Sequence, residues 1–432
     1  MVSATITTGA SRNDVRTPGA AKNVVAAVLG NAMEIYDFSV YAAFAAILGR
    51  LFFPATDARV SLLLSVATFG VGFVARPLGG IVIGAYADRY GRKRAMQLTI
   101  WLMALGSGMI GLLPTYTQIG YFAPVLLVLT RLLQGFSAGG EVGPSTTFLV
   151  ESAPPDRQGF FGSWQLASQN IGNLISGLVG VSIAFAIPQE AMDGWGWRIP
   201  FLLGILIAPL GVWIRRSLVE TMDESEALAS MSAVLSNVFK DNWKTVAVTI
   251  MMFAGVTVPQ FFFIYGTTYA VTTLGFSQGM GMAVTLVMGI SGAIFALVGG
   301  MLADRFGLKS IALIPRIIVT ILFYPAMQFV LSYNEPALFL VVIAALMALH
   351  AMSGASAIIL MPKAFPPNVR TAGMSIAYSF GVALFGGTAQ IVFTWIIGAT
   401  GDKLSWILYV VGMSLIGTVG ILLLREPEEL RN

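Results

Sequence analysis

Long apolar runs follow one another along almost the whole of this 432-residue chain. A helix needs about 20 apolar residues to cross the hydrocarbon of a membrane, and each run is about that long. Of all residues, 56% are hydrophobic and 11% are charged, whereas soluble domains average about 25% charged residues. The sequence therefore predicts an all-α membrane protein with twelve transmembrane helices, at 23–49, 60–86, 94–114, 121–149, 160–187, 197–216, 244–270, 278–302, 309–331, 336–361, 370–398 and 404–424.

The Lys and Arg residues are spread unevenly over the connections between these runs. With the N-terminus placed inside, 18 of the 25 fall on cytoplasmic segments and four fall in outer loops. Because basic residues collect on the cytoplasmic side, we expect both termini there. The first residues lack the basic-then-apolar order of a cleaved signal peptide. We therefore expect cytoplasmic tails at 1–22 and 426–432.

A polar stretch at 217–242 divides the runs into two bundles of six helices, 23–216 and 243–425. The two halves share a loop sequence, which reads GAYADRYGRKR at 84–94 and GMLADRFGLKS at 300–310. Asp88 and Asp304 are 216 residues apart, half the length of the chain. Repeated six-helix units related by an axis along the membrane normal are typical of transporters. Such units can expose a central site to either side by rocking against each other.

The repeated loop has its own mechanics. Gly84 and Gly300 let helices approach closely. Asp88 and Asp304 lie at a helix end, where each can pair with an Arg or accept hydrogen bonds from a neighbouring helix N-terminus. Two copies in register favour a cytoplasmic gate over a plain turn that merely follows the charge bias. We assign this gate to Gly84, Asp88, Arg89, Gly91, Arg92, Gly300, Asp304, Arg305 and Gly307.

Glu34 and Asp37 interrupt the first apolar run. A carboxylate at the centre of a membrane span costs about 2.5–3.5 kcal/mol, so these acids need a functional reason to be there. Residues three apart share one helix face. Like charges held close together in a low dielectric cannot both stay ionised easily. We therefore expect one of the two to carry a proton near neutral pH.

Arg131 lies near the middle of the fourth run, and Gln134 shares its face. We expect Asp37 and Arg131 to form a buried pair that releases Arg131 to bind an anion when Asp37 is protonated. The alternative is a structural ion pair that locks two helices together. Glu141 lies ten residues further, about 15 Å nearer the cytoplasm. It is assigned to proton coupling, or else to helix packing within a run of small residues.

An anionic substrate needs positive groups and hydrogen-bond donors. Arg76 and His350 are candidates beside Arg131, although Arg76 could instead cap carbonyls freed by Pro77, and a lone His is usually a satisfied core group. Arg316 is expected to extend its charge to the cytoplasmic surface, and Trp195 and Trp197 to anchor the outer interface. That leaves the second half without Arg or Lys at mid-membrane depth. The complete set assigned to substrate is Arg131, Arg76, Gln134, Gln165, Gln169, Asn170, His350, Gln260, Tyr265 and Tyr378.

Six further stretches carry a resemblance over residues 22–425. They read GNAMEIYDF (30–38), FVARPLGG (73–80), RLLQGFSAGGEVG (131–143), GWGWRIPF (194–201), RRSLVET (215–221) and ATGDK (399–403). With the doubled loop they resemble the metabolite:proton symporter branch of the major facilitator superfamily, and within it bacterial citrate–proton symporters and tricarballylate carriers.

The resemblance implies uptake of a small organic anion with protons, by a rocker-switch mechanism, in the bacterial cytoplasmic membrane. It also implies a role for Arg131 in proton coupling. The branch includes carriers of dicarboxylates, shikimate and zwitterionic osmolytes, so these substrates stay open.

Other classes of protein fit the sequence less well. The chain has no Cys and one His, so thiolate and multi-histidine metal sites are excluded, and no cofactor other than the proton is expected. No phosphate-binding G-x-x-x-x-G-K-[ST] loop is present, which argues against ATP-driven transport. The sequence has no cluster of catalytic residues that would indicate an enzyme. The net charge of +4 does not indicate nucleic-acid binding. A drug–proton antiporter would carry a Gly-Pro motif in the fifth run, and this run has none. A uniporter would not need the acid pair of Glu34 and Asp37. We expect a monomer in the lipid bilayer.

Overall fold

Helices make up almost all of the structure, a computed structural model that describes residues 20–55, 58–205, 209 and 230–424. No strand occurs in this part of the chain. The long helices are α1 (Ala20–Ala43), α3 (Ala58–Tyr90), α4 (Arg92–Leu112), α6 (Phe122–Glu151), α7 (Gln158–Ala186), α11 (Trp243–Thr272), α12 (Gln278–Phe306), α13 (Leu308–Tyr333), α14 (Pro336–Lys363) and α17 (Trp406–Leu423). The shorter ones are α2 (Ala45–Phe52), α5 (Tyr116–Ile119), α8 (Gln189–Ala191), α10 (Met231–Ser236), α15 (Arg370–Gly381) and α16 (Gly387–Thr400).

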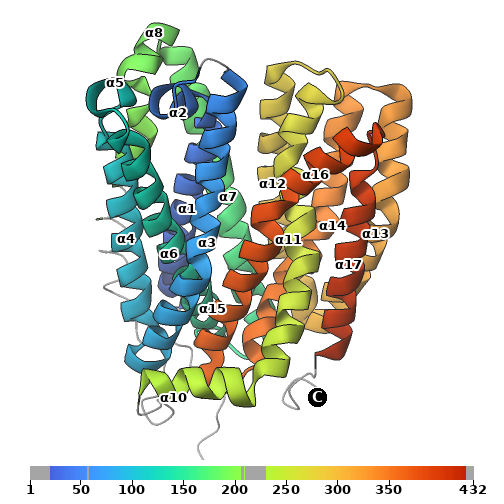
Figure 1. Ribbon diagram of the computed structural model, residues 1–432. Coiled ribbons are helices and arrows are strands. Elements are labelled where there is room, and N and C mark those ends of the chain that lie inside the picture. The colour runs from blue at the N-terminus through green and yellow to red at the C-terminus, as the bar shows by residue number, and fades with distance from the viewer. Residues whose placement is uncertain (1–19, 56–57, 206–208, 210–229, 425–432) are drawn as a thin grey trace, which may run out of the picture.

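The helices form two sets that stand side by side (Figure 1). In the N-terminal set α3 and α4 pack along α6, and α1 packs along α7. In the C-terminal set α14 packs along α12 and α13, and α11 along α17. Contacts of α7 with α12, and of α15 with α3 and α6, join the two sets. We call the end where α10 lies the α10 end, and the opposite end, which carries α2, α5 and α8, the α5 end (Figure 1).

Nine helical segments within the described residues are long and apolar enough to cross a membrane. They match the predicted runs except those at 23–49, 160–187 and 197–216. The first of these is divided into α1 and α2, the second is the single helix α7, and most of the third beyond residue 205 lies outside the described residues. The eleventh run is interrupted by the π-helical segment Val382–Gly386 between α15 and α16.

The polar stretch at 217–242 is helical where it is described. Ser230 caps α10 by accepting from the Ala233 amide, and a π-helical turn, Asn237–Asp241, continues it. Val234 and Val238 are fully buried against the main core, so this segment is attached to the bundle. Residues 217–229, the predicted tail at 426–432 and residues 1–19 of the predicted tail at 1–22 lie outside the described residues, whereas residues 20–22 begin α1.

The doubled loop adopts the same backbone in both halves. Gly91 between α3 and α4 has φ 103°, and Gly307 between α12 and α13 has φ 89°. Only glycine takes up these angles at little cost. The repeat inferred from the sequence is therefore also a repeat in conformation.

Close contact between α3 and α6 depends on glycine. A Cβ on Gly135 would overlap the carbonyl oxygen of Gly72, and one on Gly139 would overlap that of Arg76. Small residues at such crossings let two backbones touch. The small-residue run therefore lets α6 pack closely on α3, and it brings Arg76 on α3 to the helix that carries Arg131.

Two expectations for single residues are wrong. Arg316 does not reach the surface: it is 1% exposed, and its guanidinium occupies a notch where Gly255 of α11 and Gly417 of α17 lack side chains. Its Nε donates to the Ser353 hydroxyl at 3.1 Å. Trp197 is fully buried, whereas Trp195 is 56% exposed. The expectations for Arg316 and Trp197 are wrong for the same reason: both side chains turn toward neighbouring helices and not toward the membrane surface.

Candidate functional site

Asp37 and Arg131 are connected by a chain of hydrogen bonds in the interior of the N-terminal set. Arg131 Nη1 donates to Gln134 Oε1 at 2.6 Å, and Gln134 Nε2 donates to Ser107 Oγ at 2.9 Å. The Ser107 hydroxyl in turn donates to the Asp37 carboxylate. All four side chains are at most 4% exposed. Asp37 and Arg131 are therefore linked through Gln134 and Ser107, and their direct pairing stays a prediction. Ser107 of α4 is a member of this network that sequence reasoning missed.

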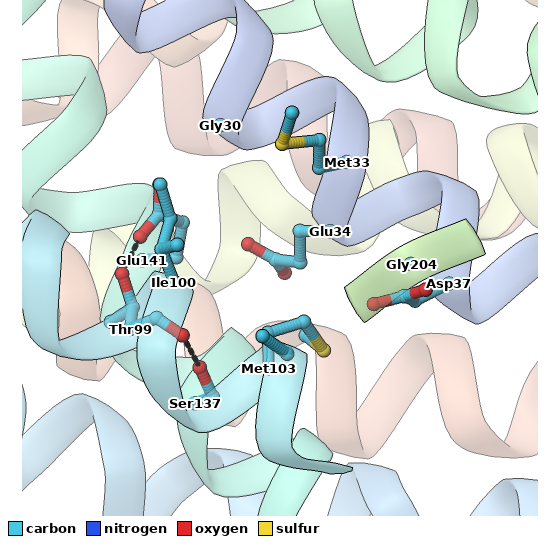
Figure 2. A pocket seen from close by; sticks show the side chains of 11 residues that line it. Gly30, Met33, Glu34, Asp37, Thr99, Ile100, Met103, Ser137, Glu141 and Gly204 are labelled. Carbon is cyan, nitrogen blue, oxygen red and sulfur yellow. Dashed lines mark hydrogen bonds between the residues drawn. The ribbon is translucent and has the colours of Figure 1, made fainter. Parts of the chain in front are cut away.

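A small cavity lies beside this network (Figure 2). Its volume is about 20 Å³, and residues of α1, α4 and α6 line it together with Gly204. Glu34, Asp37 and Glu141 all reach it, and Figure 2 shows Glu34 between the other two. Glu34 and Asp37 therefore share a helix face, as their spacing predicts. Glu141 joins them from α6.

Glu141 is held from α4. Thr99 Oγ1 donates to Glu141 Oε2, and Ser137 Oγ donates to the Thr99 carbonyl at 2.7 Å. These bonds link α4 and α6 on the α10 side of Arg131. Sequence reasoning singled out Glu141 but missed Thr99, because nothing in the sequence tells which helix will face Glu141.

Phe38 lies between two arginines. The guanidinium carbons of Arg76 and Arg131 are each 4.5 Å from the centre of the Phe38 ring. Arg76 also lies 4.5 Å from the Phe73 ring, and Arg131 lies 4.3 Å from the Tyr41 ring. Cations near aromatic faces are stabilised by about 2 kcal/mol or more when desolvated. The aromatic rings thus help to hold two positive charges in a buried position. A signal for this existed in the sequence, since Phe38 directly follows Asp37 and Tyr41 lies three residues after Phe38, on the same helix face.

Arg76 lies where the two sets of helices meet, and Arg131 lies next to it on α6, beside the Phe38 ring. The Arg76 guanidinium and the Tyr378 hydroxyl of α15 form a hydrogen bond. The Phe73 ring contacts the Phe261 ring of α11 edge-on at 5.8 Å. The structure therefore groups Arg76, Arg131 and Tyr378 of the predicted substrate residues at one junction.

The polar residues of α7 serve other contacts. The Gln165 side-chain oxygen accepts from Ser145 Oγ at 3.0 Å, and the Gln165 backbone carbonyl accepts from Asn31 Nδ2 at 2.8 Å. These bonds connect α7 to α6 and α1. Asn170 donates to the Leu166 carbonyl at 3.0 Å and packs against Gly292 of α12. Gln169 is only half-buried, and its Nε2 has no hydrogen-bond partner among the described residues. Of these three, Gln165 and Gln169 each keep an Nε2 donor without a partner among the described residues.

Apart from Tyr378, the predicted substrate residues of the second half are His350, Tyr265 and Gln260. His350 is 2% exposed, and its ring centre lies 5.5 Å from that of Phe263. The positive charge of Arg316, which also lies in the C-terminal set, acts on the His350 ring. Tyr265 packs against Phe393 with ring centres 5.6 Å apart. Gln260 is half-buried on α11. Their assignment to substrate stays a prediction.

The two loop aspartates each cap a helix of the opposite set. Asp88 accepts from the backbone amides of Thr371 and Ala372 at 3.3 and 2.6 Å, in the first turn of α15. Asp304 accepts from those of Gly159 and Phe160 at 2.6 and 2.8 Å, in the first turn of α7. The first amides of a helix lack internal partners and carry partial positive charge. The predicted contacts are thus present in both copies, and they join the two sets at the α10 end.

The two copies differ in the cations around them. Arg92 lies 3.4 Å from both Asp88 and Glu151, and Arg370 of the opposite set lies 3.4 Å from Glu151. In the second copy Leu308 stands at the position of Arg92. Arg89 and Arg305 lie over the neighbouring rings of Tyr90 and Phe306, at 5.1 and 5.2 Å. The Asp88 contact is therefore the more buried and the more strongly paired.

We expect Asp88→Asn to favour separation of the two sets at the α10 end. A hydrogen bond to a charged group contributes about 1.5–3 kcal/mol, so the separated population should rise about tenfold or more. The chain has no Cys, so spin labels on Tyr90→Cys and Phe306→Cys report the distance between the two loops without further changes.

Asp304→Asn should have a smaller effect, because Asp304 is exposed and solvent competes for its hydrogen bonds. Asp156→Asn, an exposed acid near the same end, is the control and should leave the distances unchanged. Equal distance distributions in Asp88→Asn and wild type would show that this contact does not hold the sets together.

Known proteins share both the sequence and the fold. The profile of the Major Facilitator Superfamily matches residues 27–382. The citrate-proton symporter of Klebsiella pneumoniae is 37% identical over 380 residues, 87% of this chain and 85% of that protein. The glycine betaine/proline/ectoine/pipecolic acid transporter OusA of Dickeya dadantii is 32% identical over 418 residues, 94% of this chain and 83% of that protein. The solved structure of the proton:xylose symporter XylE bound to 6-bromo-6-deoxy-D-glucose has a TM-score of 0.78 at 17% identity, and covers 93% of this chain and 94% of that one.

These likenesses agree with the paired sets of helices and the doubled loop that joins them. They confirm the resemblance read from the sequence stretches, and the relatives are transporters, not enzymes. With this fold and these relatives, the chain belongs to the Major Facilitator Superfamily of membrane transporters.

Proposed function

We propose that this protein takes up a small organic anion, citrate or a related tricarboxylate, together with protons. The observation that carries the proposal is the pair of buried guanidinium groups of Arg76 and Arg131, both in the N-terminal set and both beside the Phe38 ring, with Asp37 linked to one of them. The citrate-proton symporter at 37% identity supports the choice of cargo and coupling ion.

The link between Asp37 and Arg131 supports coupling. When Asp37 is ionised, its negative charge attracts Arg131, to which it is linked by hydrogen bonds through Ser107 and Gln134. When Asp37 takes a proton, that attraction is lost and the guanidinium is available to a substrate carboxylate. Proton binding and anion binding thereby favour each other, which is the thermodynamic requirement for symport.

The presence of two buried arginines close to each other supports a substrate with more than one carboxylate. Buried like charges repel each other, and Arg131 feels the charge of Arg76. A polyanion placed between them would relieve that repulsion, and Arg binds carboxylates in a two-pronged geometry. Tyr378 adds a hydroxyl from the opposite set.

A zwitterionic osmolyte is the second candidate, because the osmolyte transporter OusA of Dickeya dadantii aligns with more of this chain than the citrate carrier does, 94% against 87%. A betaine or proline molecule has one carboxylate and one cation. It would use one arginine, and its cation would face aromatic rings. Dicarboxylates and shikimate-like acids fall between these choices.

The proposal includes a topology. Twelve spans place both termini and the α10 end in the cytoplasm of a bacterium, with 23–216 and 243–425 as the two moving bundles in the inner membrane and the protein as a monomer. On that topology the Asp88 and Asp304 contacts seal the cytoplasmic side. Opening them while the outer side closes completes a rocker-switch cycle.

Ligand-induced thermal stabilisation of the purified protein tests the substrate class. Citrate and tricarballylate should raise the unfolding temperature more than succinate, shikimate, proline or betaine, because they engage both arginines. In liposomes, an acid-outside pH difference should then drive accumulation of the tightest binder. Stabilisation by proline and betaine alone would favour the osmolyte reading. Accumulation that ignores the pH difference would refute proton coupling.

A further inference from the structure

The cavity of Figure 2 is large enough for one water molecule. A water needs roughly 10–15 Å³ of such space and a few polar partners, and this cavity offers about 20 Å³. Glu34, Asp37 and Glu141 reach it from two helices, and Thr99 and Ser137 also line it. No Lys, Arg or His is among the lining residues.

Asp37 gives an independent sign that a polar molecule occupies this space. Its side chain is 4% exposed, and Oδ1 has no hydrogen-bond partner among the described residues. Leaving a buried carboxylate oxygen unsatisfied is strongly unfavourable. Gly204, which also lines the cavity, has no Cβ to crowd Oδ1. A water in the cavity would supply the missing donor.

Thr99 can serve Glu141 in either protonation state. With Glu141 ionised, the Thr99 hydroxyl donates to Oε2. With Glu141 protonated, the carboxyl group donates to Thr99 Oγ1, and the hydroxyl proton turns to the Met96 carbonyl 3.0 Å away. The Thr99 backbone is fixed by the hydrogen bond from Ser137. No side chain has to move when the proton arrives or leaves.

We propose that one water in this cavity carries a proton from Asp37 to Glu34, which passes it on to Glu141, and that Thr99 is the positioning residue that keeps Glu141 ready to exchange it. This proposal rests on the proposed function and deepens it. Protonated Asp37 gives its proton to the water, the water gives one of its own protons to the Glu34 carboxylate, and Glu34 gives a proton to the Glu141 carboxylate and ends ionised. Asp37 ends ionised, Glu141 ends protonated, and the water is unchanged.

The order of the groups gives the path a direction. Asp37 is linked to Arg131 at the helix junction, and Glu141 lies ten residues further along α6, about 15 Å toward the α10 end. Glu34 lies between them in Figure 2 and is the other titratable group at the cavity. The proton thereby leaves the arginine site, and Arg131 is drawn back to Asp37.

Thr99→Val tests the positioning role, with Thr99→Ser as the rescue. Valine keeps the shape of the side chain and removes the hydroxyl. The pH profile of uptake into liposomes, measured with citrate or the tightest binder, should shift by about one pH unit in Thr99→Val and stay at the wild-type position in Thr99→Ser. Thr418→Val removes a hydroxyl that bonds only its own helix at 2.8 Å, and should change nothing.

Infrared titration of carboxyl groups in the reconstituted protein provides a readout that needs no substrate. Glu141→Gln should remove one titrating band, and Thr99→Val should move that same band along the pH axis. An unmoved band in Thr99→Val would overturn the proposal, as would accumulation driven by a Na⁺ gradient at equal pH, which would make the cavity a sodium site. Wild-type uptake that ignores pH would instead refute the proposed function, and the infrared result would still decide the role of Thr99.

Discussion

Asp37→Asn should abolish accumulation driven by a pH difference and leave exchange of labelled for unlabelled substrate intact. Asparagine has nearly the shape of a protonated aspartate, keeps an acceptor for Ser107, and cannot release a proton. The protein should therefore cycle as if permanently protonated, which allows exchange and forbids net coupled transport. Labelled citrate in liposomes measures both, and the internal concentration should not exceed the external one.

Asp193→Asn is the matched control, because that acid is paired with Arg50 in an exposed salt bridge, away from the cavity. It should accumulate substrate as the wild type does. Gradient-driven accumulation by Asp37→Asn at the wild-type level would remove Asp37 as the proton carrier and leave Glu34 and Glu141 as candidates.

Arg131→Ala should weaken binding of carboxylates about 30-fold or more, since removing one partner of a buried charge pair costs about 2–5 kcal/mol. The change also leaves Phe38 and Tyr41 without the guanidinium that lies against them. Isothermal titration of the purified protein with citrate measures the loss directly.

Arg131→Lys separates charge from geometry. It retains the positive charge and loses the two-pronged hydrogen bonding, so it should bind with intermediate affinity. Arg50→Ala, at the exposed salt bridge, should bind as the wild type does. If Arg131→Ala folds and binds carboxylates with unchanged affinity, Arg131 is not a ligand and the proposed site is wrong.

Much of the architecture could be derived without coordinates. The apolar runs require helices in lipid, because a backbone there must satisfy its own hydrogen bonds. The doubled loop predicted two similar halves, and the capping by Asp88 and Asp304 follows from an acid placed at a helix end. The buried acids of the first run and Arg131 stood out because charge in an apolar run is costly.

Which side chains meet was decided only by the packing of the helices. Sequence spacing places residues on a face of one helix, but it does not say which other helix that face will touch. Ser107 and Thr99 therefore went unnoticed on α4, and Phe38 was not seen as the ring between two arginines.

Arg316 shows the same division. Its helix was correctly inferred, yet its buried position depends on Gly255 and Gly417, which are far away in sequence and adjacent in space. The sequence by itself determined the membrane-spanning fold, the repeat and the charges that need an explanation. The tertiary structure alone decided their partners, because those contacts join helices whose mutual rotation is set by the packing of the whole bundle.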